Sequence, residues 1–308
     1  MNTEFKSLLD LSNKFPNELS CIEFFSNARW GDKPVCVHCG SSRKIYKVAG
    51  GKLYKCADCR KQFSVRIGTI FEDSALPLRK WFMAIYLLMA HKKGISSVQL
   101  AKDISVTQRT AWFMLHRIRH AVKTKSFEKK LTGTIEADET YIGGKESNKH
   151  MDKRTPYTQG RSTKTKTAIF GIAQRDGIVS AQTVEHVNHD TVKKILLDQV
   201  DPNADIMTDE LNSYNGIGKH FKSHNSINHG SKEYVRGSIH TNGIESFWAI
   251  LKRGIYGIYH HVSHKHLNRY VDEFEFRYNS RELKDSDRFS MTLSHLQGRL
   301  LYVNLTKA

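Results

Sequence analysis

The sequence predicts a multidomain α/β protein, and three observations along the chain support this prediction. Four cysteines stand as two CxxC pairs within residues 36–59. Residues 76–125 have the apolar periodicity of helices only. From residue 131 short apolar strands alternate with helical runs, as in GTIEADETYI, TAIFGIAQ, IVSAQTVEH and DTVKKILLDQV. We therefore expect three domains, with boundaries at 1–70, 71–128 and 129–308.

The charge balance favours a polyanionic partner. The 308 residues carry 48 Lys and Arg against 31 Asp and Glu, a net charge of +17. Such a field attracts nucleic acid above all, with an anionic membrane surface as a weaker alternative. The longest apolar run, at 81–90, is half of the roughly 20 residues that a membrane span requires. The N-terminus lacks a signal-peptide core, so we expect a cytoplasmic protein with reduced thiols, DNA as its partner and no membrane.

The cysteine pairs indicate a structural zinc site. Cys36, Cys39, Cys56 and Cys59 form the pattern C-x2-C-x16-C-x2-C. Two such pairs can close a tetrahedral thiolate site on Zn²⁺, and four thiolates leave no open position for catalysis. The alternative is a pair of disulfides, which a reducing compartment disfavours.

Residues 94–122 have the layout of a helix-turn-helix. One helix is expected to begin at Ser96, a turn falls at 104–106, and a second helix begins at Thr107. The basic residues of the second helix are expected off the core side and in contact with DNA; they are Arg109, Arg117 and Arg119. A small helical bundle without a DNA-binding role would give the same pattern.

Acidic residues interrupt two apolar strands of the third segment. Period-2 alternation places Glu136 and Asp138 of GTIEADETYI on one strand face. Asp209 ends the apolar strand ADIMTDE. Carboxylates at such positions are poor core residues but good ligands for hard divalent cations. Taken singly, each could also be a solvated strand end.

The segment HTNGIESFWAILKRG, residues 240–254, reads as an amphipathic helix. Its apolar stripe would consist of Ile244, Phe247, Trp248, Leu251 and Ile255. Asn242, Glu245 and Lys252 share a second arc, away from the core. Glu245 and Lys252 lie two turns apart, roughly 10 Å along the axis, too far for a good ion pair. A surface helix with scattered charges is the alternative reading.

Taken together, these motifs resemble the DDE transposases of bacterial insertion sequences. The matching stretches are FPNELSCIEFFSNARWGDKPVCVHCG, IEADETYIGGK, MTDELNSY and HTNGIESFWAILKRGIYGIYHHVSHKHLNRYVDEFEFRYNSR. Nearly the whole chain is similar to the zinc-ribbon branch known as ISXO-two-like, the fifteen-ninety-five family. The resemblance implies an N-terminal zinc ribbon at 1–70, a helix-turn-helix DNA-binding domain at 71–128 and a ribonuclease-H-like catalytic domain with a mixed sheet at 129–308.

The resemblance also implies a mechanism and its residues. Asp138, Asp209 and Glu245 would bind two Mg²⁺ or Mn²⁺ ions that support nicking of transposon ends and then strand transfer into target DNA. Lys252 would hold a DNA phosphate or a terminal base. Family members vary between Asn and Glu at the third ligand position, so Asn242 is the alternative to Glu245; the charge and spacing of Glu245 favour it. Glu136, Glu139 and Glu210 are expected to be neighbours rather than ligands.

Further basic and aromatic residues suit DNA ends. Such a patch is expected from Lys252, Arg253, Tyr256, Tyr259 and His260. The histidines of 259–266 are expected to contact phosphate or cap helices rather than bind a metal. Residues 145–166, rich in Lys and Arg, read as a mobile basic loop. By resemblance, synapsis of two ends requires at least a dimer on DNA, in the bacterial cytoplasm at the nucleoid.

Two other functions fit parts of the pattern. A non-catalytic DNA-binding regulator would need only the zinc module and the helix-turn-helix. It gives no reason for Asp138, Asp209 and Glu245 to occur at this spacing. A ribonuclease-H-like nuclease without strand transfer would need the same acids, so only analysis of the reaction products separates it from a transposase.

Overall fold

The computed structural model describes residues 4–123, 130–144, 146–156, 158, 162–228, 230 and 235–307. The chain forms two compact units. Unit 1 comprises Met1–Val122 and Glu282–Ala308, and unit 2 comprises Lys123–Arg281. The boundary expected between 128 and 129 lies outside the described residues. The first two predicted domains share unit 1, and the C-terminal segment, expected in the third domain, belongs to unit 1 as well.

Unit 1 begins with two helices and a small sheet. Helix α1 spans Leu8–Lys14 and α2 spans Glu18–Trp30, where the Asn17 side chain caps the first turn of α2. Strands β1 (Ile45–Val48), β2 (Leu53–Cys56) and β3 (Gln62–Phe63) follow as an antiparallel sheet in the order β1-β2-β3. The first cysteine pair precedes β1, and the second lies at the end of β2 and in the turn after it, as expected for a zinc ribbon.

The predicted helix-turn-helix layout is confirmed. Helix α3 spans Leu78–Ala90, α4 spans Ser97–Asp103 and α5 spans Gln108–Ala121. The side chains of Ser96 and Thr107 accept hydrogen bonds from the backbone N–H groups of Gln99 and Thr110, so each caps its helix. The turn between α4 and α5 includes Ser105, whose φ of 52° is left-handed.

The C-terminal segment completes the core of unit 1. Helix α9 spans Asp285–Ser294 and α10 spans Tyr302–Thr306. The ring of Phe289 lies 5.2 Å from that of Phe5 and 5.5 Å from that of Phe82. A guanidinium nitrogen of Arg288 donates to the carbonyl of Met89 at 2.9 Å. These contacts explain why residues after 281 belong to unit 1 rather than to the α/β domain.

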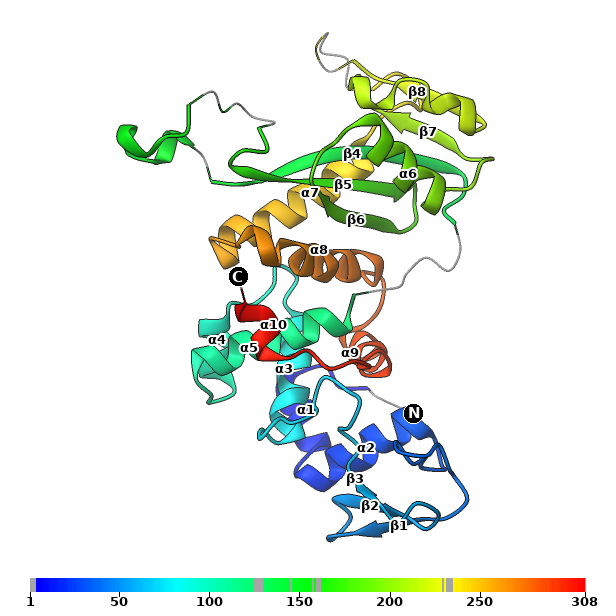
Figure 1. Ribbon diagram of the computed structural model, residues 1–308, viewed down its shortest axis with the longest axis vertical. Coiled ribbons are helices and arrows are strands. Elements are labelled where there is room, and N and C mark those ends of the chain that lie inside the picture. Colours follow the sequence, from blue (N-terminus) through cyan, green and yellow to red (C-terminus); the bar gives the residue numbers. More distant parts are fainter. Residues whose placement is uncertain are drawn as a thin grey trace. The chain divides into compact units, whose positions relative to one another are not determined.

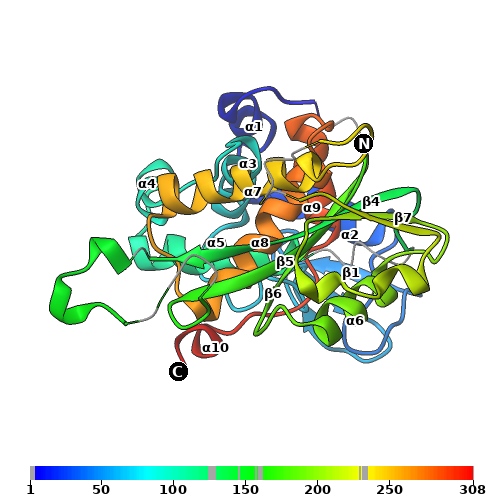
Figure 2. The same cartoon turned by 90° about the horizontal axis from the view of Figure 1, so that it is seen from above.

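Unit 2 is built on a five-stranded mixed sheet in the order β6-β5-β4-β7-β8 (Figures 1 and 2). Its strands span Thr134–Gly143 (β4), Lys166–Gln174 (β5), Val179–Val184 (β6), Asp205–Thr208 (β7) and Ser223–Ser226 (β8). Strands β4, β5 and β6 pair antiparallel, whereas β7 runs parallel to both β4 and β8. This confirms the predicted mixed sheet.

Helices cover both faces of this sheet. Helix α6 (His189–Gln199) packs on one face through Val192 and Leu196. Helices α7 (Asn242–Gly254) and α8 (His264–Asn279) pack on the other face and are joined by a π-helical turn, η6 (Ile255–Tyr259). The predicted stripe of α7 is buried as expected, in Ile244, Phe247, Trp248, Leu251 and Ile255. Figure 1 shows α7 running along the sheet beneath β4 and β5.

The remaining turns are short. The 3-10 helices η3 (Asn212–Tyr214) and η4 (Ile217–His220) follow β7. The described part of the basic segment forms η1 (Glu146–Asn148) and η2 (Met151–Lys153), where Glu146 bonds Lys149 and the backbone of Thr155. Lys145 lies outside the described residues. Among the residues described, the helices are all too short or too polar to cross a bilayer.

Candidate functional site

Strand β4 brings the acidic residues into the middle of the sheet. It lies between β5 and β7, and Met207 of β7 is paired with Glu136. Continuing this register by two residues places Asp209 level with Asp138 on the neighbouring strand. The pairing of the strands therefore brings Asp138 close to the end of β7.

Three carboxylates converge at this point and form the acidic cluster. One carboxylate oxygen from each of Asp138, Glu139 and Asp209 lies within 4.8 Å of the others. Glu139 and Asp209 are buried. Burial and the nearby charges of Glu139 and Asp209 raise the pKa of Asp138 to about 7, from an ordinary 3.8. An assembly of hard oxygen donors that resist joint ionisation fits a divalent cation such as Mg²⁺ or Mn²⁺.

A different donor holds each carboxylate of the acidic cluster. The indole nitrogen of Trp248 donates to Oδ2 of Asp138 at 3.0 Å. The hydroxyl of Tyr214 donates to Oε2 of Glu139 at 3.2 Å, and the backbone N–H of Leu211 donates to Oδ1 of Asp209 at 3.0 Å. Burial and the neighbouring acids raise the pKa of Tyr214 well above its usual range, so its phenol remains a donor.

Trp248 reaches Asp138 because the residue of β5 beneath its indole is a glycine. Gly171 of β5 is the register partner of Asp138. A Cβ at Gly171 would lie 2.6 Å from Cη2 of Trp248, closer than real Cβ contacts come. The glycine therefore provides the space in which the indole lies against the sheet and points its N–H at the acidic cluster.

Glu136, two residues before Asp138 on β4, has a different role from a metal ligand. Its Oε2 accepts hydrogen bonds from the backbone N–H groups of Gly243 at 2.7 Å and Ile244 at 3.1 Å. Its Oε1 forms an ion pair with Arg175 at 3.1 Å and lies 3.3 Å from Nδ1 of His240. Glu136 thus caps the start of α7 from the neighbouring strand, because Thr241 offers α7 no side-chain cap. The expectation that Glu136 is a neighbour of the ligands agrees with these contacts.

Glu245 and Asn242 lie in the first turn of α7, exposed to solvent. Oε1 of Glu245 accepts a hydrogen bond from the Thr241 hydroxyl at 2.7 Å. Among the described residues, the group of carboxylates within 4.8 Å contains Glu139 in place of Glu245. Glu139 is expected from the sequence to be a neighbour rather than a ligand, and period-2 alternation places it on the opposite strand face from Asp138. Its position immediately after Asp138 was the available signal.

The predicted DNA-binding residues of unit 2 differ in how far their side chains are exposed to solvent. Lys252 and Arg253 lie in the last turn of α7, and Arg253 donates to the carbonyl of Ala249 at 3.0 Å. His260 is exposed. Tyr259 is only partly exposed because its hydroxyl donates to Glu273 at 2.9 Å. The hydroxyl of Tyr259 is therefore bonded within the protein.

Two predicted DNA contacts on α5 are wrong. Arg117 is 4% exposed and donates to the backbone carbonyls of Ile70 and Leu300 at 2.7 and 3.1 Å, so it ties three segments of unit 1 together. Arg119 is fully buried. Neither side chain lies off the core as expected. Arg109 is exposed, and its guanidinium lies over the ring of Tyr302.

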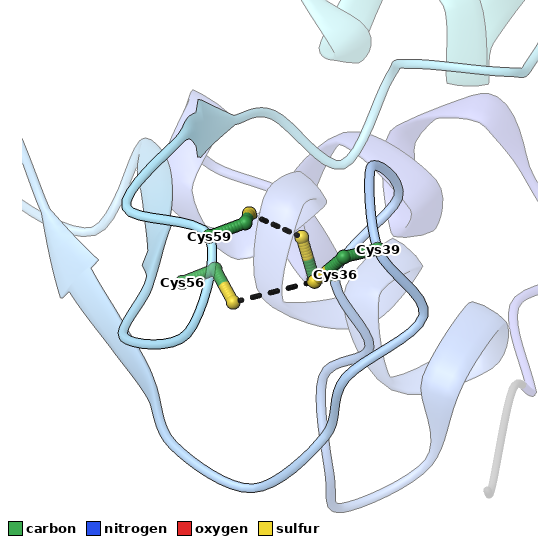
Figure 3. Close-up of side chains that lie close together, drawn as sticks. All are labelled: Cys36, Cys39, Cys56 and Cys59. Carbon is green, nitrogen blue, oxygen red and sulfur yellow. Dashed lines mark hydrogen bonds between the residues drawn. The ribbon is translucent and has the colours of Figure 1, made fainter.

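The four predicted zinc ligands converge (Figure 3). The Sγ atoms of Cys36 and Cys59 lie 3.6 Å apart, and those of Cys39 and Cys56 lie 3.8 Å apart. A tetrahedral Zn²⁺ with bonds of about 2.3 Å separates its sulfurs by about 3.8 Å. Burial opposes ionisation of Cys36, but hydrogen bonds from the backbone N–H groups of His38 and Cys39 lower the pKa of its thiol to about 6. The donor set fits a structural zinc.

Comparison with known proteins agrees with both parts of the chain. The family described as ISXO2-like transposase domain matches residues 130–279, and the transposase zinc-ribbon domain matches residues 16–62. An uncharacterised protein in transposable element ISH50 of Halobacterium salinarum is 27% identical over 275 residues, 85% of this chain and 91% of that protein. An uncharacterised transposase-like protein of Haemophilus influenzae is 31% identical over 101 residues, 33% of this chain and 80% of that protein.

A Mos1 transposase paired-end complex with the left transposon end is among the solved structures that match this chain. That match has a TM-score of 0.30 and 13% identity, and covers 71% of this chain and 80% of the other. The family assignment does not rest on this TM-score or identity but on the two family matches and the relatives. Because its zinc ribbon, its sheet domain and a relative above 30% identity all agree, the chain belongs to the IS1595 family of insertion-sequence transposases, which have an ISXO2-like transposase domain.

Proposed function

We propose that this protein binds the ends of its insertion sequence and catalyses DNA cleavage and strand transfer by the DDE mechanism. The convergence of Asp138, Glu139 and Asp209 within 4.8 Å is the observation that supports this most directly. A regulator that only binds DNA would gain nothing from three carboxylates, two of them buried, that repel one another.

Asp138 and Asp209 would hold the catalytic Mg²⁺ or Mn²⁺, with Glu245 as the third carboxylate. Two such cations, when bound, supply activation of the attacking oxygen and stabilisation of the leaving oxygen in phosphodiester chemistry. Trp248 and the N–H of Leu211 orient the two aspartates through the hydrogen bonds described above. Glu245 would leave Thr241 when it binds a cation.

The protein's basic groups would position the DNA. Lys252 lies two turns beyond Glu245 on α7, where it would hold a phosphate next to the cleaved one. Arg253 and His260 extend this cationic surface beyond the end of α7. Arg109 and the zinc ribbon of unit 1 would contribute further contacts to the end sequence. Synapsis of two ends requires a dimer or higher oligomer on DNA, at the bacterial nucleoid.

Single-turnover nicking of a duplex that contains the transposon end tests the third ligand. In Mg²⁺, Glu245→Gln removes a negative charge from the metal site, so nicking should fall about 10³-fold while end binding survives. Asn242→Ala should cost less than tenfold, because a neutral amide can only orient water or DNA.

Glu139→Gln tests the remaining possibility, that Glu139 is the third metal ligand. If Glu139 is only a neighbour held by Tyr214, this variant should nick within about tenfold of wild type, since Gln accepts the same hydrogen bond. An inactive Glu139→Gln beside an active Glu245→Gln would assign the third position to Glu139. An inactive Asn242→Ala beside an active Glu245→Gln would assign it to Asn242. Joining of precut ends to a target plasmid then separates a transposase from a nuclease.

A further inference from the structure

A cleft of about 880 Å³ lies in unit 2 beyond the acidic cluster, where β4 and β5 meet the turn between α7 and α8. We call it the β4–η6 cleft. Its wall is apolar and aromatic, formed by Ile142, Ile255, Tyr256 and Val262. Its cationic and imidazole groups are Lys164, Lys166, His260, His261 and His264. No acidic residue belongs to the described lining of this cleft, so it favours an anionic ligand with an apolar face.

Tyr256 is positioned so that another ring can stack on its side chain. The residue is 47% exposed, although its hydroxyl is bonded to the end of β4. The hydroxyl donates to the carbonyl of Gly143 at 3.3 Å and accepts from the N–H of the same residue at 3.5 Å. An aromatic ring held at one edge and open on its face offers a nucleobase stacking at little entropic cost.

The backbone and a buried hydroxyl also indicate a ligand. The chain leaves α7 through the π-helical turn Ile255–Tyr259 and then adopts a φ of +58° at His260, a conformation that costs a non-glycine residue free energy. The hydroxyl of Thr165, in the cleft lining, is buried and has no hydrogen-bond partner within the described structure. Such a group is satisfied when a ligand supplies its partner.

The position of the cleft relates it to the acidic cluster. Ile142 of the cleft wall and Asp138 share one face of β4, four residues or about 13 Å apart. A DNA strand rises about 3.4 Å per stacked nucleotide, so this distance corresponds to about four nucleotides. Lys252 and Arg253 lie on α7 between Glu245 and the cleft.

From these observations we infer that the β4–η6 cleft binds one unpaired nucleotide of the DNA, about four nucleotides from the phosphate at the acidic cluster. Its base would stack on Tyr256, and Lys164, Lys166 and the histidines would take its phosphates. The cleft is large enough to hold one nucleotide. The inference rests on the proposed function, and the nucleotide can come from the transposon end or from the target.

A mismatch scan tests this inference on the full-length protein. Single mismatches are placed in turn at each position near the cut of a terminal-repeat duplex, and in parallel in a target duplex without the repeat. A mismatch lowers the cost of unpairing, so wild type should bind about tenfold more tightly when it falls near the fourth nucleotide. In Tyr256→Ala this gain should shrink to less than about twofold, whereas Tyr256→Phe, which keeps the ring, should retain it.

Leu283→Ala is the control, because Leu283 is 40% exposed and lies just before α9, outside the zinc ribbon and the cleft; it should keep the full gain. A position-specific gain in either duplex that depends on Tyr256 supports the inference and identifies the source of the nucleotide. A wild type that binds and nicks the end but shows no such gain in either duplex overturns the inference alone. A wild type that neither binds nor nicks the end overturns the proposed function, and the inference with it.

Discussion

The indole of Trp248 donates a hydrogen bond to Oδ2 of Asp138 across 3.0 Å, over the space left by Gly171. This bond links the apolar stripe of α7, which packs the helix on the sheet, to the acidic cluster. Trp248 therefore packs in the core through its ring and orients a proposed metal ligand, Asp138, through its indole N–H.

Removing this donor should weaken cation binding. In Trp248→Phe the carboxylate loses a hydrogen bond to its charged form, worth about 1.5–3 kcal/mol. We expect the Mg²⁺ concentration for half-maximal nicking to rise about tenfold. Trp81→Phe is the control, since its indole N–H donates to the Ser74 hydroxyl at 3.0 Å in unit 1. It should lose stability but keep the wild-type Mg²⁺ dependence; equal Mg²⁺ shifts in both variants would refute the role of Trp248.

The start of α7 should depend on Glu136. Glu136→Gln replaces a carboxylate that accepts two backbone N–H bonds and faces Arg175. Because Gln has one acceptor oxygen and no charge, we expect a loss of about 1–3 kcal/mol in the free energy of unfolding. Glu23→Gln, at an exposed ion pair with Lys47, should change stability by less than about 0.5 kcal/mol in the same urea titration. A urea midpoint for Glu136→Gln equal to that of wild type would rule out the capping role of Glu136.

Asp272 on α8 should make stability depend on pH. Burial raises its pKa to about 6, against the attraction of Lys123 and Arg269 and a hydrogen bond from Asn268. Because the folded pKa exceeds the unfolded 3.8, the folded state binds more protons between these values, and stability falls as the pH rises through them. Asp272→Asn should therefore stabilise the protein near pH 7.5, by up to about 3 kcal/mol, but little near pH 4. Urea unfolding at both pH values checks this; a gain of equal size at the two would contradict it.

The zinc site predicts a metal content. Purified protein should contain about one tightly bound Zn²⁺ per chain. Cys56→Ser should lose it and destabilise the fold of β1–β3, because the ligands lie on separate turns. Cys21→Ala, at a buried cysteine outside the CxxC pairs, should keep the metal. Elemental analysis that finds no zinc beside four reactive thiols would exclude the site.

Local patterns predicted the elements well, for identifiable reasons. Ser96 and Thr107 are caps whose effect is confined to one helical turn, so the helix-turn-helix could be read from neighbours in sequence. The two CxxC pairs carry their geometry in their spacing. The acids of β4 and β7 stood out because charged residues are rare in apolar strands.

Contacts between distant segments could not be predicted in this way. Arg117 looked exposed on its helix because nothing local indicates that Leu300 returns to cover it. The same return of the C-terminal segment changed the expected domain boundary. The cap that Glu136 supplies to α7 joins residues 107 positions apart, and the entry of Glu139 into the acidic cluster depends on how β4 meets β7.

The central claim is that the acidic cluster holds the catalytic cations. The most direct measurement is single-turnover nicking of a terminal-repeat duplex in Mg²⁺ by Asp138→Asn and Asp209→Asn, with end binding measured on the same preparations. The account predicts that each variant binds the end as wild type does and nicks it about 10³-fold more slowly or not at all. Nicking by either variant at near the wild-type rate would contradict the account.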